Sequence, residues 1–253
     1  MTTTPAHAWL TCPKLNPQAR LRLFCFPYAG GGASAFRTWS DDLPPDIEVC
    51  LVKLPGRESR LTEPLYMQLS PLVQTLAQVL VPSLNPPFVF FGHSMGAPIS
   101  FELVHELRRQ MRPGPSHLFV AARRAPHIPE SKPPIHRLPE SEFVEELRRL
   151  NGTPEEVLQH AELMQLMLPI LQADFALCET YSYTTKEPLD CPISAFGGLQ
   201  DLRVSRDDLA AWRQQTRSSF ALRMLPGDHF FVHNSQAPLL SAIARDLTRL
   251  FVQ

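Results

Sequence analysis

The sequence predicts an α/β fold, in which a mostly parallel central sheet is flanked by helices and carries a helical insertion. Short apolar runs alternate with helix-length segments along most of the 253 residues, and such alternation is typical of parallel sheets covered by helices. Residues 128–185 break the alternation, because they hold helical segments and no convincing strand. We therefore expect one domain over residues 1–253, with residues 128–185 inserted over the functional edge of its sheet. The alternative is a helical subdomain with only a structural role.

The expected strands are short apolar runs bounded by turn residues. They cover residues 21–26, 48–54, 88–91, 117–122, 193–196 and 220–225. The run at 88–91 is wholly apolar, as expected of a strand that is buried on both faces of its sheet.

The expected helices fill the gaps between these runs. They cover residues 70–81, 96–111, 207–215 and 238–250, and within the insertion residues 140–150, 154–159 and 162–181. Ser70 and Pro71 open the first of them, where proline is tolerated because the first helical N–H groups lack partners anyway. The last insertion helix carries Leu163, Met167 and Ile170 at helical spacing, which predicts one apolar face.

Composition excludes several functional classes. Hydrophobic residues make up 44% of the chain and the formal net charge is -1, so neither nucleic acid nor an anionic membrane surface is an expected partner. Residues 1–15 lack the basic start and apolar stretch of a signal peptide, and no apolar run is read as long enough to span a bilayer. The five cysteines show no CxxC spacing, so we expect no disulfide framework, no metal site and a cytoplasmic location.

A nucleophile motif follows the third strand. Gly92-His93-Ser94-Met95-Gly96 has the pattern G-x-S-x-G and stands between an apolar strand and a helix. On such a turn the serine hydroxyl projects above the sheet, and the helix start favours developing negative charge. The alternative is a buried serine in a glycine turn. The context favours Ser94 as a nucleophile.

A glycine-rich loop follows the first strand and predicts an oxyanion hole. Three of only 11 glycines are consecutive there, at Gly30, Gly31 and Gly32. Acyl transfer needs preplaced N–H donors for the tetrahedral oxyanion. In this architecture one donor is the residue after the nucleophile, here Met95, and the other lies in an early loop. We place the second donor at Ala29, with a neighbouring glycine as the alternative.

The acid and the base are expected after later strands, in the chain order Ser, Asp, His. His229 follows the strand at 220–225, whereas His233 lies one helical turn further on and is interpreted as structural or lid-facing. The strand at 193–196 leads through Gly197 and Gly198 to Asp201, which would orient the imidazole of His229. Asp228 is interpreted as a turn residue.

Several stretches together resemble one family. FCFPYAGGGASAFRTW, VKLPGRESRLTEP, FVFFGHSMGA, LPILQADFALCETY, PISAFGGLQD and LPGDHFFVH are similar to the type II thioesterases that accompany polyketide synthases and nonribosomal peptide synthetases, which have the α/β-hydrolase fold. They run from about residue 22 to 234. The LPGR loop, the LPxLxAD helix and the GDHFF segment are not general hydrolase features. Two departures concern the early loop, where many relatives have histidine in place of Tyr28 and two glycines rather than three.

The resemblance implies a free-standing serine-dependent thioesterase that removes stalled or mis-primed acyl groups from the phosphopantetheine arms of carrier proteins. The family's triad falls on Ser94, Asp201 and His229, and its oxyanion donors fall on Met95 and Ala29. The insertion corresponds to the family's helical lid over an acyl chamber. The expected partners are acyl or peptidyl carrier domains and an acyl thioester. No cofactor of its own is expected, because the carrier bears the phosphopantetheine.

Substrate contacts and rival functions are less constrained by the sequence. Tyr28, Leu163, Met167 and Phe175 are proposed to line an acyl pocket, with lid packing as the alternative role of the three lid residues. Because carrier proteins are usually acidic, three arginine pairs are considered as a docking face: Arg108-Arg109, Arg123-Arg124 and Arg148-Arg149. Arg123-Arg124 is favoured because it follows a strand end near the expected active-site edge, and solvated surface charge is preferred for the other two pairs. The rivals are a product-releasing or medium-chain fatty acyl-carrier-protein thioesterase, a general esterase, an acyltransferase and a catalytically silent binding module.

Overall fold

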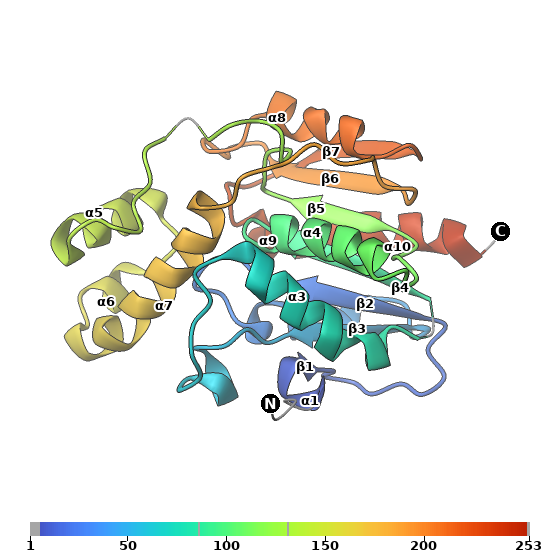
Figure 1. Ribbon diagram of the computed structural model, residues 1–253, viewed down its shortest axis with the longest axis horizontal. Helices are drawn as coiled ribbons and strands as arrows, with labels where there is room; N and C mark the ends of the chain where they lie inside the picture. Colours follow the sequence, from blue (N-terminus) through green and yellow to red (C-terminus); the bar gives the residue numbers. More distant parts are fainter. Residues whose placement is uncertain (1–5, 86, 131, 252–253) are drawn as a thin grey trace.

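The computed structural model describes residues 6–85, 87–130 and 132–251. Residues 1–5, 86, 131 and 252–253 lie outside the described residues. The expectation that residues 1–15 hold no signal peptide falls partly on the first of these, and residue 131 belongs to the expected insertion. Seven strands form one sheet in the order β1-β3-β2-β4-β5-β6-β7 (Figure 1). Only β1 runs antiparallel to its neighbour. The expected fold class is confirmed.

Six strands coincide with the expected apolar runs; β2 and β7 have the expected bounds, and the ends of β3, β4, β5 and β6 differ by one or two residues. The strands are β1 Leu10–Thr11, β2 Leu21–Phe26, β3 Ile47–Val52, β4 Phe88–His93, β5 Leu118–Ala121, β6 Ile193–Gly198 and β7 Phe220–Leu225. Strand β4 continues past the apolar run because Gly92 and His93 still pair with Val120 and Ala121 of β5. Strand β1 was not predicted, since two residues carry no periodicity and the partner strand lies some forty residues away.

Helices cover both faces of the sheet (Figure 1). One face carries α3 Leu69–Leu80, α4 Gly96–Arg109, α8 Arg206–Ala210 and η4 Ala211–Gln215, and the other carries α2 Trp39–Asp42, α9 Phe231–Asn234 and α10 Gln236–Thr248. Strand side chains alternate between the faces. Phe90 therefore packs edge-on against Phe24 at 5.9 Å, whereas Phe91 packs against Trp39 at 4.7 Å on the opposite face.

Short elements complete the layers. They are α1 Ala6–Trp9 and the 3₁₀ turns η1 Ala33–Phe36, η2 Glu58–Arg60, η3 Val81–Ser83 and η5 Arg249–Phe251. The helix expected at 207–215 is split into α8 and η4, and it begins with a capping box between Ser205 and Asp208. A side-chain oxygen at this position accepts an otherwise unpartnered helical N–H, which explains where the helix starts.

The insertion forms three helices beside the sheet, at the end where the parallel strands finish (Figure 1). They are α5 Glu140–Leu150, α6 Glu155–Leu158 and α7 Ala161–Glu179. Their facing sides bury a separate apolar cluster made of Phe143, Leu147, Leu158, Met164 and Leu171. No strand occurs between 122 and 192 in the part of the chain that the structure describes.

Helix α7 is long and apolar enough to cross a membrane, judged by length and composition alone. This differs from our reading that no apolar run has that length. The structure uses the helix otherwise. It packs on α6, carries Pro169 in its interior and buries the carboxylate of Asp174. A third of its apolar window is buried within the fold, whereas Leu163 and Leu166 are exposed.

Candidate active site

Ser94 lies on a sharp turn between β4 and α4. Its backbone has φ 51°, a left-handed conformation that is costly for residues other than glycine and is found mostly where the surrounding structure imposes it. The Ser94 N–H donates to the carbonyl oxygen of Ala121 in β5 at 2.8 Å, which fixes the turn against the neighbouring strand. The hydroxyl is thereby raised above the end of the sheet, as the G-x-S-x-G motif predicts.

The two glycines of the motif are required by close backbone approach. A Cβ atom at Gly92 would lie 2.2 Å from the carbonyl oxygen of Gly96. A Cβ atom at Gly96 would lie 2.1 Å from the carbonyl oxygen of Phe26. Because the obstacles are backbone atoms on a central strand and a helix, they cannot move aside as a flexible side chain could. Strand β2, strand β4 and helix α4 therefore meet at a spacing that only glycine permits.

This crowding gives a stability prediction. Gly96→Ala is expected to lower the free energy of unfolding by about 3 kcal/mol, because overpacking displaces backbone that the core holds in place. Urea unfolding followed by circular dichroism measures the change. Gly114→Ala is the matched control, since a Cβ atom there meets nothing within 4 Å, and we expect a change within about 1 kcal/mol. Equal stability of the two variants would contradict this account of the turn.

Ser94, His229 and Asp201 form a hydrogen-bonded chain. The Ser94 Oγ lies 3.0 Å from His229 Nε2, and His229 Nδ1 lies 2.9 Å from Asp201 Oδ2. Since a carboxylate only accepts, Nδ1 carries the proton and donates it, which leaves Nε2 free to accept from the hydroxyl. His229 is 6% exposed. The structure thus brings together the three residues that the sequence picked out.

Two loops hold the acid beside the base. The Gly198 Cα faces the carbonyl oxygens of Gly227 and Asp228, and a Cβ there would lie 2.2 Å from the latter. The Gln200 N–H donates to the Gly227 carbonyl oxygen at 2.9 Å. Glycine at 198 therefore serves close approach of the two loops, rather than only the turn we expected. Asp228 accepts from the Phe230 N–H at 2.9 Å, in keeping with a turn role.

Burial and hydrogen bonding set the protonation states of His229 and Asp201. Burial lowers the pKa of His229, the hydrogen bond to Asp201 opposes that effect, and the Arg203 cation reinforces it. Burial alone would raise the pKa of Asp201, but hydrogen bonds from His229 and from the N–H groups of Arg203 and Val204 outweigh it, so that pKa is lowered. The resting site therefore holds a neutral imidazole and an ionised carboxylate, as a general base requires.

The lowered pKa of His229 predicts the pH profile. The imidazole accepts a proton only when neutral, so kcat/KM for ester or thioester hydrolysis should rise with pH through the pKa of His229 and then stay level. Because that pKa lies below its ordinary value of 6.5, we expect the midpoint of the rise below pH 6.5. Initial rates at low substrate concentration across pH 4.5 to about 9 test this. A midpoint at or above 6.5 would contradict the electrostatic account.

The glycine-rich loop and the turn at Ser94 present two free N–H groups. Among the described residues, no acceptor is hydrogen-bonded to the N–H of Ala29 or of Met95. The two glycines nearest to Ala29 are occupied, because Gly30 N–H donates to Asp174 Oδ2 at 2.8 Å and Gly31 N–H donates to the Tyr28 carbonyl oxygen at 2.9 Å. The geometry therefore favours Ala29 over those two glycines as the second oxyanion donor.

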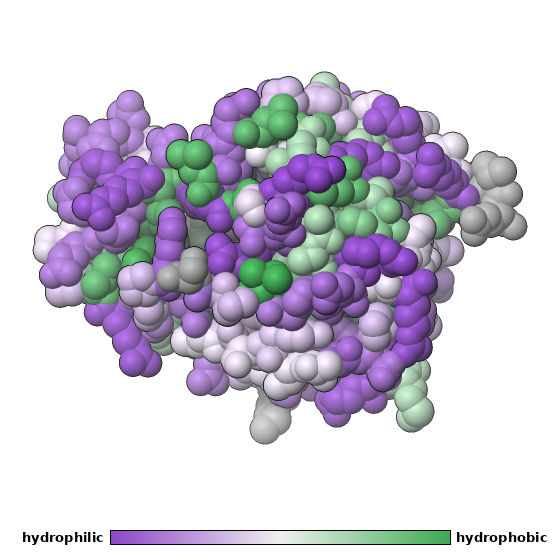
Figure 2. Space-filling model, turned by 90° about the horizontal axis from the view of Figure 1, so that it is seen from above, coloured by the Kyte–Doolittle hydropathy of each residue, from purple (hydrophilic) through white to green (hydrophobic). Residues whose placement is uncertain are grey.

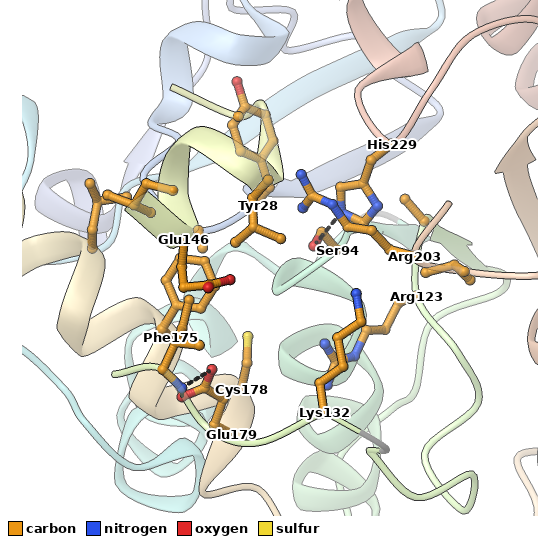
Figure 3. Close-up of a pocket in the computed structure, with 18 of the residues that line it drawn as sticks. Tyr28, Ser94, Arg123, Lys132, Glu146, Phe175, Cys178, Glu179, Arg203 and His229 are labelled. Atoms are coloured by element: carbon orange, nitrogen blue, oxygen red, sulfur yellow. Dashed lines mark hydrogen bonds between the residues drawn. The ribbon is translucent and has the colours of Figure 1, made fainter. Parts of the chain in front are cut away.

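A cavity lies over Ser94 and His229, between the strand ends and helices α5 and α7. Seen from above, the surface is hollowed between these helices and the body of the molecule (Figure 2). In Figure 3, Ser94 and His229 face Phe175, Cys178 and Glu179 of α7 across the cavity. The wall combines apolar side chains with charged ones, among them Arg123, Lys132 and Glu179. A concave site over reactive side chains is the usual place for substrate to bind.

Two of the four predicted substrate-binding residues line this cavity and two do not. Tyr28 and Phe175 are part of its wall. Leu163 is 41% exposed, and Met167 packs within the apolar cluster of the three insertion helices. Both lie before Pro169, in the half of α7 that is directed away from the strand ends. Helical spacing identified an apolar face, but it could not show which part of that face covers the site.

Tyr28 links the early loop to the loop that carries the base. Its hydroxyl lies 2.8 Å from His233 Nε2, and its ring packs edge-on against His93 and Phe230 at 5.6 and 5.3 Å. The ring of His93 also packs edge-on against His229 at 5.7 Å. His233 thus has a structural role, as expected, and the aromatic cluster restrains the imidazole of His229.

The arginine pairs considered for docking are mostly engaged in ion pairs. Arg108 pairs with Asp190, Arg109 with Glu106, Arg124 with Glu130, Arg148 with Glu145 and Glu155, and Arg149 with Glu146. Arg123 and Arg124 both line the cavity wall, and Figure 3 labels Arg123 near Ser94. Both side chains are only partly buried, and a docking role of this pair stays a prediction.

One side-chain cluster away from the cavity has potential metal ligands. Cys12, Glu48 and Cys50 offer ligand atoms within 4.8 Å of one another, which spacing in the sequence did not reveal. The two oxygens of Glu48 already accept from Asn16 N–H at 2.8 Å and from Arg22 Nε at 2.5 Å. A bound cation would displace these donors and face the Arg22 cation, so the residues do not favour a metal.

The sheet order and the strained serine turn define the class of this protein as an α/β-hydrolase fold. Within that class the chain belongs to the thioesterase family, because the family model for a thioesterase domain matches residues 21–250. It is a thioester hydrolase, and its resemblance to the type II thioesterases of polyketide and nonribosomal peptide pathways is confirmed.

Individual relatives cover almost the whole chain. The gramicidin S biosynthesis protein GrsT of Aneurinibacillus migulanus is 49% identical over 241 residues, which are 95% of this chain and 94% of GrsT. The structure of the RedJ thioesterase from the prodiginine pathway of Streptomyces coelicolor is 40% identical with a TM-score of 0.84, covering 90% of this chain and 85% of RedJ. BorB, a type II thioesterase from the borrelidin cluster, is 33% identical with a TM-score of 0.86, covering 97% and 99%.

Proposed function

We propose that this chain is a free-standing editing thioesterase that hydrolyses stalled or mis-primed acyl groups from the phosphopantetheine arms of carrier proteins. The observation that carries the proposal is the hydrogen-bonded chain of Ser94, His229 and Asp201 inside a cavity roofed by the insertion helices. The family membership supplies the thioester chemistry, and the names of the relatives point to polyketide or nonribosomal peptide assembly.

The mechanism follows from the positions of these groups. His229 Nε2 takes the proton of Ser94 while Oγ attacks the thioester carbonyl carbon, and Asp201 stabilises the imidazolium that forms. The N–H groups of Met95 and Ala29 hold the tetrahedral oxyanion. The bond to sulfur then breaks, and His229 returns its proton to the departing thiol. A water molecule, deprotonated by His229, releases the acid from the acyl-enzyme in the same way.

Residues 128–185 act in this proposal as a lid on a single domain. Phe175 and Leu171 of α7 and Leu147 of α5 give the cavity an apolar wall over the nucleophile. Such a wall holds an acyl chain and keeps bulk water from the acyl-enzyme. The carrier-borne arm supplies the thiol, so no cofactor of the enzyme's own takes part. The proposed location is the cytoplasm.

The test uses a carrier domain loaded through its phosphopantetheine arm with acetyl or longer acyl groups. Release of the acyl group is followed by mass spectrometry of the intact carrier. Turnover of the loaded carrier, with faster release of short or aberrant units than of long chains, supports editing. A preference for long chains would assign product release instead. Turnover of simple oxygen esters without release from the carrier would move the protein to the general esterases.

A further inference from the structure

Two sequence segments that distinguish this family have no part in the reaction described so far. The first is the loop at residues 54–57, and the second is the stretch at 168–174 in α7. Their charged side chains meet in the fold. Arg57 Nη2 donates to Asp174 Oδ1 at 2.7 Å, and Arg57 Nη1 donates to Asp174 Oδ2 at 2.9 Å. The exposed fractions of Arg57 and Asp174 are only 8% and 2%.

Both members of this pair also hold the glycine-rich loop. Asp174 Oδ2 accepts from the N–H of Gly30 at 2.8 Å, and Arg57 Nη1 donates to the carbonyl oxygen of Gly31 at 2.8 Å. The peptide unit between Ala29 and Gly30 and the one between Gly31 and Gly32 are therefore fixed by side chains that come from elsewhere in the sequence. Gly30 has φ 74°, a conformation that the loop adopts with little steric cost because glycine lacks a Cβ atom.

We propose that Arg57 and Asp174 are positioning residues that set the oxyanion hole and make it depend on the docked lid helix. They act through the backbone of Gly30 and Gly31, which aims the adjacent N–H of Ala29 at the reacting carbonyl oxygen. The inference rests on the proposed role of Ala29 as the second donor. It assigns to the two family-specific segments a shared function that neither has alone.

The energetics favour a positional role over a purely stabilising one. Burying two charges costs desolvation energy that their attraction often does not recover, so such a pair is weak evidence for stability by itself. Here the desolvated carboxylate also supplies a strong, charge-assisted acceptor at one defined point of the loop. Because the N–H of Gly30 is held by Asp174, the peptide unit between Ala29 and Gly30 cannot rotate when the oxyanion develops.

Packing ties the same point to the lid. Leu171 lies one helical turn before Asp174 in α7. Its side chain packs against Gly30, because a Cβ atom at Gly30 would lie 2.6 Å from Leu171 Cδ2. When α7 is docked, the loop receives both an apolar contact and the Asp174 carboxylate. If α7 moved away, Gly30 N–H and the Arg57 guanidinium would both lose their buried partner. The arrangement of Gly30 therefore depends on the docked lid helix, whereas Gly31 keeps its bonds to Arg57 and Tyr28.

A trifluoromethyl ketone analogue of acyl-pantetheine tests this directly. Ser94 Oγ adds to its carbonyl carbon, the hydroxyl proton passes to His229, and the C=O π electrons become an oxyanion that occupies the hole. Asp174→Asn and Arg57→Lys are expected to raise the inhibition constant of this analogue by about 10²-fold, similar to loss of one oxyanion donor. The kcat for thioester hydrolysis should fall by the same factor while KM stays nearly unchanged.

The matched control is a second ion pair with a buried carboxylate, and neither of its members lines the cavity. Arg223 donates through Nη1 and Nη2 to the two carboxylate oxygens of Asp246, both at 2.7 Å, and Asp246 is 5% exposed. Asp246→Asn should lower the unfolding temperature as a broken buried pair does, but it should leave the analogue's inhibition constant and kcat unchanged. Thermal unfolding followed by circular dichroism identifies a temperature at which every variant is folded, and the inhibition constants and kcat are measured at that temperature.

Asp174→Glu is the milder second variant, because it keeps the charge and moves the carboxylate by one methylene. It should weaken analogue binding to an intermediate degree if Asp174→Asn does not fold. Unchanged inhibition constants in folded Arg57 and Asp174 variants would overturn the proposal and leave only a structural pair. Failure of the wild type to release carrier-bound acyl groups would instead overturn the proposed function, while the effect on analogue affinity would remain measurable.

Discussion

Replacing Ser94 with alanine is expected to lower kcat for release of a carrier-bound acyl group by about 10⁶-fold. Ser94 Oγ is the group that receives general-base help, because it lies 3.0 Å from the free nitrogen of His229. Without Ser94 Oγ no acyl-enzyme forms, and water must attack the bound thioester directly. Single-turnover release from the loaded carrier, followed by mass spectrometry, measures rates over this range.

The control is a serine of the helix that follows the turn at Ser94. Ser100 in α4 is buried and donates its hydroxyl to the Ala97 carbonyl oxygen at 3.0 Å. Ser100→Ala should retain kcat within a few-fold, since no reacting group depends on it. Ser94 is only half-buried, so Ser94→Ala should keep the unfolding temperature of the wild type. A loss of less than about tenfold in folded Ser94→Ala would remove Ser94 from the role of nucleophile.

Local pattern was sufficient for the elements that place the triad. Strands β2 and β7 have the expected bounds, and the residues after β4, β6 and β7 are those that converge at the site. Parallel strands end at one edge, so a motif that follows each strand is placed in space once the alternation is recognised. The triad is therefore predictable, because each member depends only on its own strand and the next turn.

The remaining features depend on contacts that no local pattern reveals. Arg57 and Asp174 are 117 residues apart in the sequence, and neither spacing nor periodicity indicates that they pair. Leu163 and Met167 were assigned to the cavity because they share an apolar face, yet Leu163 is exposed and Met167 packs within the cluster of the insertion helices. Strand β1 likewise exists only through its pairing with β3.

Asp201→Asn should lower kcat by about 10⁴-fold, although it changes a single atom. Asp201 Oδ1 accepts from the N–H groups of Arg203 and Val204 at 2.8 and 3.3 Å, so the carbonyl oxygen of an asparagine would occupy that position. Its amide group would then face His229 Nδ1 as a donor. The imidazole would have to accept there and carry its proton on Nε2, where it could no longer receive the proton of Ser94.

The pH profile distinguishes this cause from general damage to the site. If the wrong tautomer is responsible, hydroxide can take over the role of the base. The rate of folded Asp201→Asn should then keep rising at pH values where the rate of the wild type is already level. Asp228→Asn is the neighbouring control, because an asparagine still accepts from the Phe230 N–H, and we expect its kcat within a few-fold of the wild type. Equal losses in the two variants would show that the turn, rather than the orientation of His229, limits the rate.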